Sequence, residues 1–248
     1  MLRNSLVRHA PRFPAGFARI SLCLLVAGLT FAGAGCGTIH APDWGGGEGP
    51  SFKPANYVDF GPLPAAVRRV GVLAIHSDAW RGNELATLDA AFAGELAKFD
   101  RFETVAISRE ELQARFGQDS YLSTSVLPAS MLERLHTDFA LDAVLFVDLT
   151  HYSPYQPIAM GVRSRLVAVE DARTLWAFDA LFDAAQPDVA VAARRYQTEF
   201  SRPSYPLEDT SGILQSPSRF AKYVAHAVFS TLPGRNGKNP EKNPAKSR

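Results

Sequence analysis

Two histidines and an aspartate follow predicted strands, which is where α/β sheets commonly hold their functional side chains. His76 and Asp78 follow an apolar run at 68–75, and His151 follows another at 143–149. Both runs are rich in β-branched residues and typical of buried strands. Because sites in open α/β sheets lie beyond the carboxyl ends of parallel strands, the three side chains are candidates for a metal site or an acid–base pair. Their spacing does not require this, and a loop histidine satisfied by backbone or water is commoner.

The other reactive side chain is Cys36, one of two cysteines in the sequence. It follows an arginine-bearing segment without acidic residues (1–19), an apolar run (20–31) and small residues (32–35). This order is that of a secretory signal peptide, and the apolar run is shorter than the roughly 20 residues of a spanning helix. Since Cys23 lies in the part predicted to be removed, the mature chain would keep one thiol, at its first residue.

The junction of Ala34, Gly35 and Cys36 resembles the bacterial lipobox, in which the thiol receives a diacylglyceryl group and becomes the new N-terminus. Gly33 departs from the leucine usual in that pattern. A free thiol is the alternative, but it is a liability in an oxidising compartment, which favours acylation. Gly37, where aspartate would mark retention, resembles the pattern sent to the outer membrane. We therefore expect a lipid-anchored envelope protein, in the outer membrane and facing the periplasm.

Two further segments combine tyrosine with proline. Residues 150–157 hold Tyr152 and Tyr155, and residues 202–206 hold Tyr205. Tyrosine is enriched at interface hot spots, so these three residues are candidate partner-binding side chains. The alternative is that both segments fold back over the sheet as packed loops.

Composition argues against several classes of function. The 248 residues carry a net charge of +1 and lack a continuous stripe of basic residues. The charge pattern therefore does not indicate nucleic-acid binding. Neither a glycine-rich phosphate loop with its lysine nor a Gly-x-Ser-x-Gly elbow occurs. One mature cysteine allows neither a disulfide framework nor a thiolate metal site. We expect no enzyme activity, no catalytic residues, no cofactor, no resident metal and no nucleic-acid partner.

The segments that must position these residues alternate between strand and helix. Strands are expected at 68–75, 102–107, 143–149, 162–170 and 174–183, and helices at 85–99, 110–116, 128–140, 189–200 and 217–232. Strands separated by helices are parallel through right-handed crossovers, and the short connection at 171–173 predicts an antiparallel hairpin. The prediction is an α/β fold with a mixed sheet of about five strands, helices packed on it and the run 143–149 near its centre.

The predicted boundaries divide the chain into four parts. Residues 1–35 are the signal peptide, and residues 36–64, rich in glycine and proline, are a flexible tether. Residues 65–233 form the mixed domain, and residues 234–248 are a disordered basic tail.

Single residues carry finer predictions. Asn83 is placed to cap the helix that follows it. Arg163 and Arg165 alternate on one strand face, where they are placed to pair with Asp179 and Glu170 across the hairpin.

Five stretches of the domain resemble one known group: Val70-Gly-Val-Leu after the tether, the helix at 85–99, and the segments 102–109, 141–147 and 167–176. They resemble the periplasmic α/β domain shared by the curli-secretion lipoprotein family and the LpoB-type activators of penicillin-binding proteins. The glycine usual in that group's hairpin turn is absent here. The matching positions are mainly core and turn residues, so the resemblance implies the fold more than an activity.

Two functions remain open from the sequence. The first is a non-enzymatic binding, assembly or scaffold module that binds an envelope protein or self-associates through the tyrosine loops and an exposed sheet edge. The second is a small periplasmic hydrolase or metal-binding protein that uses His76, Asp78 and His151. Because no catalytic signature stands out, the sequence favours the first.

Overall fold

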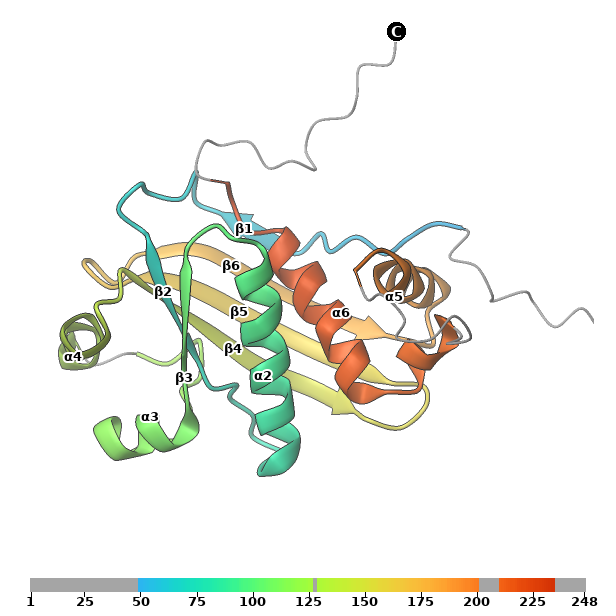
Figure 1. The fold of residues 1–248 in the computed structure, drawn as a ribbon, viewed down its shortest axis with the longest axis horizontal. Helices are drawn as coiled ribbons and strands as arrows, with labels where there is room; N and C mark the ends of the chain where they lie inside the picture. The colour runs from blue at the N-terminus through green and yellow to red at the C-terminus, as the bar shows by residue number, and fades with distance from the viewer. Residues whose placement is uncertain (1–48, 127–128, 201–209, 235–248) are drawn as a thin grey trace, which may run out of the picture. The chain divides into compact units, whose positions relative to one another are not determined.

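A six-stranded mixed sheet organises the computed structural model, which describes residues 49–126, 129–200 and 210–234. In sequence order the strands are β1 (Tyr57–Asp59), β2 (Arg69–Leu73), β3 (Glu103–Ile107), β4 (Ala143–Ser153), β5 (Ala159–Ala168) and β6 (Thr174–Asp183). Their spatial order is β1-β6-β5-β4-β2-β3 (Figure 1). β2 pairs in parallel with β3 and β4, and the remaining pairs are antiparallel. The mixed class, the parallel early strands, the hairpin and the central place of β4 are confirmed.

The sixth strand comes from the segment predicted to be a tether. β1 pairs with β6 in antiparallel register, from Tyr57 opposite Phe178 to Asp59 opposite Trp176. The backbone N–H of Asp179 continues the ladder by donating to the carbonyl of Asn56 at 3.0 Å. An unpaired β6 edge would expose its N–H and C=O groups, and β1 satisfies part of that edge. This corrects the strand number from about five to six, and residues 57–59 from tether to strand.

The helices of the described residues are α2 (Asn83–Lys98), α3 (Arg109–Phe116), α4 (Ala129–Phe139), α5 (Pro187–Phe200) and α6 (Pro217–Ser230), with a 3₁₀ turn at Thr210–Leu214. In this part of the chain none is long and apolar enough to cross a bilayer. Gly82, at φ 83°, is the N-cap of α2 and provides no side-chain cap, so the prediction that Asn83 caps this helix is wrong. A glycine adopts that positive φ without the Cβ clash other residues would meet.

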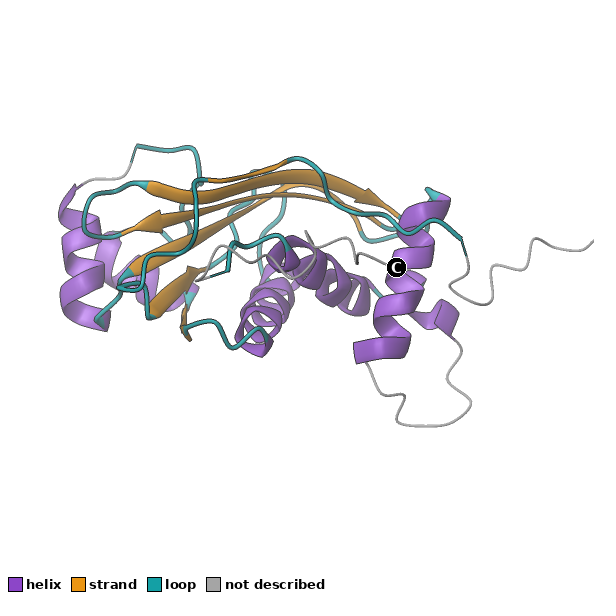
Figure 2. Ribbon diagram, turned by 90° about the horizontal axis from the view of Figure 1, so that it is seen from above, coloured by secondary structure: helices purple, strands orange, loops and turns teal. Residues whose placement is uncertain are grey.

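Two clusters of buried side chains lie on opposite faces of the sheet. The main core joins the sheet to α2, α5 and α6, which Figure 2 shows together on one side of the strands. The smaller α3–α4 core joins the other face to α3 and α4. Alternation along β4 separates them, because Leu145 and Val147 enter the main core while Val144 and Phe146 enter the smaller one.

The smaller core covers only part of its face. On β5 and β6 that face carries Arg163, Asp179 and Leu181, the last 55% exposed. Arg163 Nε contacts Asp179 Oδ2 at 2.8 Å, which confirms the predicted cross-strand pair. The second predicted pair is wrong: Arg165 lies opposite Ala177, its Nε has no hydrogen-bond partner among the described residues, and Glu170 lies beyond the end of β5.

Candidate functional site

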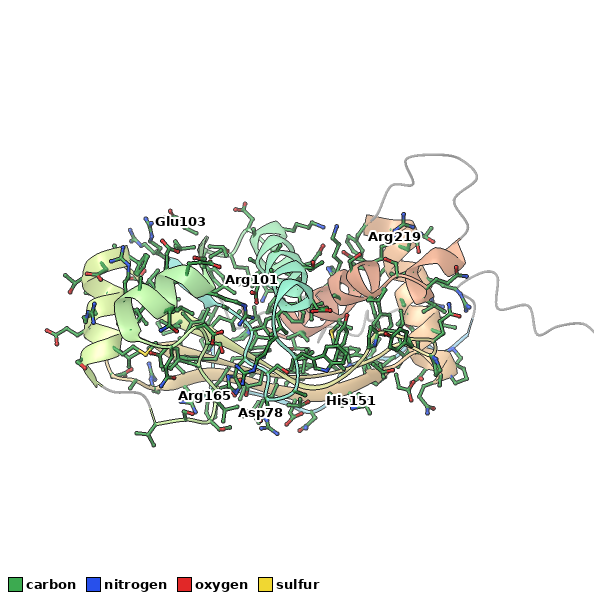
Figure 3. The ribbon with its side chains drawn as sticks, turned by 90° about the horizontal axis from the view of Figure 1, so that it is seen from below. Asp78, Arg101, Glu103, His151, Arg165 and Arg219 are labelled. Carbon is green, nitrogen blue, oxygen red and sulfur yellow. The ribbon has the colours of Figure 1, made fainter. Side chains whose placement is uncertain are left out.

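The structure brings together two of the three residues predicted to form a site. His76 Nε2 lies 3.3 Å from Asp78 Oδ1, and His76 Nδ1 lies 3.3 Å from Ser120 Oγ. His151 is exposed on β4 and makes no hydrogen bond with either residue in the described structure. Figure 3 shows Asp78 and His151 at separate positions along the sheet. The expected convergence of all three side chains is therefore not found.

The His76 cluster lacks the geometry of a catalytic triad. Both histidine contacts are at the long end of the hydrogen-bond range. The Ser120 hydroxyl donates to Asp119 Oδ1 at 3.0 Å, so its proton is not directed at His76. The side chain of Asp78 is 94% exposed and gives the imidazole no sheltered partner. Among the described residues, no group of three or more His, Cys, Asp or Glu side chains could hold a metal ion.

A partly buried ion pair beside this cluster joins the two helical layers. Arg109 on α3 contacts Asp89 Oδ2 on α2 through Nε at 3.0 Å, and its Nη2 donates to the Ile75 carbonyl at 2.6 Å. The Ile75 N–H donates to Asp89 Oδ1 at 2.7 Å. Burial raises the pKa of Asp89, while the Ile75 hydrogen bond and Arg109 oppose that rise. We call this arrangement the Asp89–Arg109 clasp, and its role is structural because every polar group in it is already paired.

A fully buried carboxylate, Asp148, fixes a loop to the sheet. It lies on β4 with 2% exposure and accepts the N–H of Ser123 at 2.8 Å and the Ser123 hydroxyl. Burial raises the pKa of Asp148, against the two Ser123 hydrogen bonds. Sequence analysis missed this residue, although it is the one charged residue in the apolar run 143–149.

The tyrosine candidates differ in their surroundings. Tyr152 belongs to β4 rather than to a loop, and its half-buried ring packs edge-on against Trp80 at 5.1 Å between centroids. Burial raises the pKa of Tyr152, and Glu84 adds to that rise. Tyr155 lies between β4 and β5 and is 80% exposed, which suits a contact residue. Tyr205 and Cys36 lie outside the described residues.

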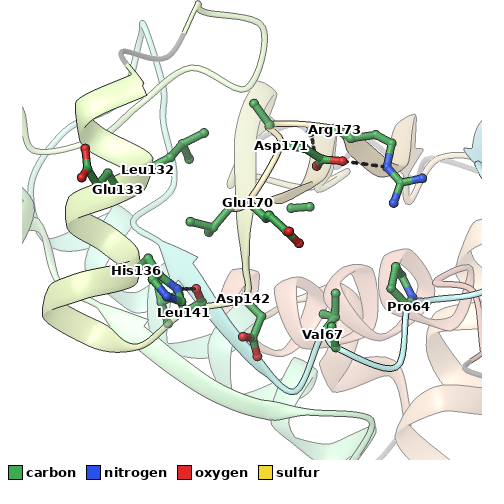
Figure 4. Close-up of a pocket in the computed structure, with 14 residues that line it drawn as sticks. Pro64, Val67, Leu132, Glu133, His136, Leu141, Asp142, Glu170, Asp171 and Arg173 are labelled. Atoms are coloured by element: carbon green, nitrogen blue, oxygen red, sulfur yellow. Dashed lines mark hydrogen bonds and ion pairs between the residues drawn. The ribbon is translucent and has the colours of Figure 1, made fainter.

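A groove of about 760 Å³ lies between α4 and the turn that joins β5 to β6 (Figure 4). We call it the α4 groove. Its walls and floor include apolar side chains from four separate segments: Pro64, Val67, Leu132, Leu141, Ala168 and Val169. Most of these side chains are buried within the fold, so the groove is built on packed core rather than on mobile surface chains.

Acidic side chains surround this apolar surface. Glu133 on α4 and Glu170 after β5 are exposed, and neither forms an ion pair with a described residue. Figure 4 shows the Glu170 carboxylate projecting into the groove. Asp171 contacts Arg173 at 3.4 Å, so the turn's arginine is already engaged. The groove therefore presents uncompensated negative charge beside apolar area.

The inner end of the groove is fixed by backbone hydrogen bonds. Asp142 Oδ2 accepts the N–H groups of Arg68 and Arg69 at 2.9 and 2.8 Å, which holds the approaches to β4 and β2 together. His136 Nδ1 lies 2.8 Å from the Leu141 carbonyl, which ties α4 to the same segment. Sequence analysis missed the groove because its charges come from segments far apart in the chain.

No protein-family model and no curated protein matches this chain. Among solved structures, it is similar to lipoprotein GNA1162 from Neisseria meningitidis, with 20% identity, 48% of this chain and 85% of that chain covered, and a TM-score of 0.38. A PelC dodecamer subunit from Paraburkholderia phytofirmans matches with 15% identity, 54% and 86% coverage, and a TM-score of 0.36. The LpoB C-terminal domain from Salmonella enterica matches with 13% identity, 46% and 82% coverage, and a TM-score of 0.32. These similarities are too distant to assign a family or a function.

Proposed function

We propose that this chain is a lipid-anchored protein of the cell envelope that acts as a non-enzymatic binding module. Its anchor is lipid on Cys36, its place is the periplasmic side of the outer membrane, and its binding surface is the α4 groove. The observation that carries the proposal is the combination of an apolar floor with unpaired carboxylates at Glu133 and Glu170.

The chemistry of the groove defines the partner. Apolar floor residues supply area that is removed from water on binding, and the carboxylates favour a positively charged segment over a neutral or acidic one. A protein segment with lysine or arginine beside small apolar residues fits both requirements. Binding needs no proton transfer, which agrees with the absence of a catalytic arrangement around His76 in the described residues.

Tyr155 provides a second candidate contact at the other end of β5. This strand begins near Tyr155 and ends near the groove, and its ten residues span roughly 33 Å. A partner that touched both places would have to lie along the strand. The two surfaces can therefore be tested separately.

The anchor is tested by Cys36→Ser in the native cell. We expect the variant to lose incorporation of labelled palmitate and to leave the membrane fraction, and we expect the unaltered protein to sediment with outer-membrane density. An unaltered protein that is secreted without acyl chains would contradict the anchor and the location together.

The binding surface is tested by placing a photo-crosslinking amino acid at Ala172 beside the groove, at Tyr155 or at Asp78. Asp78 follows the carboxyl end of β2, whereas the groove lies at the amino ends of β2 and β4, so it is a matched exposed control. Irradiation in intact envelopes should give a discrete adduct from Ala172, identified by mass spectrometry, and none from Asp78. Adducts from Tyr155 alone would reject the groove as the binding surface.

A further inference from the structure

Charge is unevenly divided along this nearly neutral chain. Residues 49–234 contain 17 lysines and arginines against 22 acidic residues, whereas residues 235–248 contain five basic residues and one acidic residue. Residues 49–234 are therefore net negative, and residues 235–248 are strongly positive. Three lysines of that segment are spaced four residues apart, at Lys238, Lys242 and Lys246.

The basic segment leaves the fold beside the α4 groove. The carbonyl of Gly234, the last described residue, accepts the N–H of Leu63 at 3.3 Å. Leu63 directly precedes Pro64, which lines the groove. Arg101 holds the same stretch by donating to the carbonyls of Leu232 and Pro233. The described part of the chain therefore ends, at Gly234, next to one wall of the groove.

The segment is also long enough to reach the far wall. Its 14 residues span up to roughly 45–50 Å when extended. Because it is tethered at the rim, its effective concentration at the groove is on the order of millimolar, so a dissociation constant of about 1 mM is tight enough for half occupancy. Its prolines and small residues suit an extended chain lying on an apolar floor.

We propose that the α4 groove binds residues 235–248 of the same chain, with their lysines against Glu133 and Glu170. The segment then acts as an internal competitor that a partner must displace. The competition, unlike the docking itself, rests on the function proposed above.

Docking is tested by lysine footprinting of the full mature chain. Acetylation rates of Lys238, Lys242 and Lys246 are measured by mass spectrometry at 20 mM and 500 mM NaCl, with the exposed Lys222 as internal reference. We expect a several-fold slower reaction of the three lysines at low salt, relieved at high salt because exposed charge pairs are screened. The double variant Glu133→Lys/Glu170→Lys should react at the high-salt rate under both conditions.

The control is Asp78→Lys/Glu84→Lys, which makes the same charge change at the opposite end of β2 and should keep the slow low-salt rate. Equal lysine rates in the unaltered and groove-reversed proteins would overturn the proposal. So would carbodiimide crosslinks that join the segment to Glu133 or Glu170 only between ¹⁴N and ¹⁵N copies in a mixed sample, because docking would then be between molecules.

The competition is tested by changing Lys238, Lys242 and Lys246 to Gln in the chain that carries the photo-crosslinker at Ala172. The yield of partner adduct should rise several-fold, and an unchanged or lower yield would overturn the competition. If no partner is captured at Ala172 while the footprint holds, the proposed function fails and the docking of residues 235–248 stands.

Discussion

The two faces of the sheet differ in how completely helices cover them. The main core extends along the strands under α2, α5 and α6 and includes the large buried side chains Trp176, Phe182 and Phe229. The α3–α4 core covers β2, β3 and the first half of β4, and it reaches β5 only through Val167 and its neighbour Val169. The α4 groove lies at the margin of this smaller core.

This difference suggests that one face of the sheet provides most of the stability and the other provides the binding surface. A face that is fully covered contributes most of the apolar burial and leaves little surface to bind anything else. A partly covered face keeps apolar side chains at its margin, where acidic residues can surround them. The proposed binding surface is therefore expected to tolerate change better than the main core, and the following variants test that division.

The largest effect is expected from Trp176→Ala in the main core. The indole is fully buried, stacks with Phe178 at 5.8 Å, and donates to Thr231 Oγ1 at 3.2 Å. Its loss should lower the free energy of unfolding by about 3–5 kcal/mol in urea denaturation. Leu135→Ala in the α3–α4 core should cost about 2–3 kcal/mol, at the low end for a buried leucine. A larger loss from Leu135→Ala would reverse the ranking of the two cores.

The next effect concerns the clasp that joins the two layers. Arg109→Lys removes the guanidinium group, which contacts Asp89 and the Ile75 carbonyl at the same time. The free energy of unfolding should fall by about 1–3 kcal/mol. Hydrogen exchange should quicken in α3 more than in α6. Arg115→Lys, at a more exposed pair with Asp138, should change stability by less than about 0.5 kcal/mol. Equal losses of unfolding free energy in the two variants would contradict a special role for the Asp89–Arg109 clasp.

Asp148 gives a pH-dependent test. Burial raises its folded-state pKa, so between the ordinary carboxyl pKa and the raised value the folded protein binds more protons than the unfolded chain. Its contribution to stability therefore falls as pH rises through that window, above pH 4. Asp148→Asn should make the decline in unfolding free energy between pH 4 and pH 7 less steep. The exposed Asp100→Asn serves as control, and a slope unchanged by Asp148→Asn would contradict the assignment.

The smallest effect is expected at the turn beside the groove. Ala172 has φ 56°, a left-handed conformation that glycine adopts without strain. Ala172→Gly should therefore raise stability by at most about 1 kcal/mol, since glycine also loses more entropy on folding. The matched change Ala90→Gly, in the exposed interior of α2, should lower stability by about 0.5–1 kcal/mol. If thermal unfolding showed lower stability for both variants, the backbone of Ala172 would not be strained as proposed.

Most elements could be predicted from sequence because they carry strong local patterns. The unbroken apolar run that begins β4 predicted a central strand, and Gly117 ends α3 in the left-handed conformation that follows many helices. The second half of β4 was missed, since His151, Tyr152 and Ser153 look like a polar loop. They form strand because β5 pairs with them beyond an irregularity between Leu149 and His151.

The missed features depend on contacts between distant segments. β1 is three residues long and has no pattern of its own, so only the free edge of β6 defines it. The groove takes Glu133 from α4 and Glu170 from a turn, and no spacing in the sequence relates the two. The opposite error occurs for His76 and His151: both were expected at strand ends, but His151 lies within β4 and the two residues do not share a site.

The short pairing of β1 with β6 sets the reach of the proposed lipid anchor. While Tyr57–Asp59 stays in the sheet and Arg195 and Asp188 hold Gly49 and Phe52, the reach of the domain is limited to the residues between Cys36 and Gly49. β1 is the shortest strand of the sheet and lies at its edge, so a pull from the membrane would detach this strand before the others. Residues 49–62, which precede the buried core residue Leu63, would then add up to roughly 46–50 Å of extended chain. A domain held close to one membrane could thereby extend toward a more distant surface without unfolding its core.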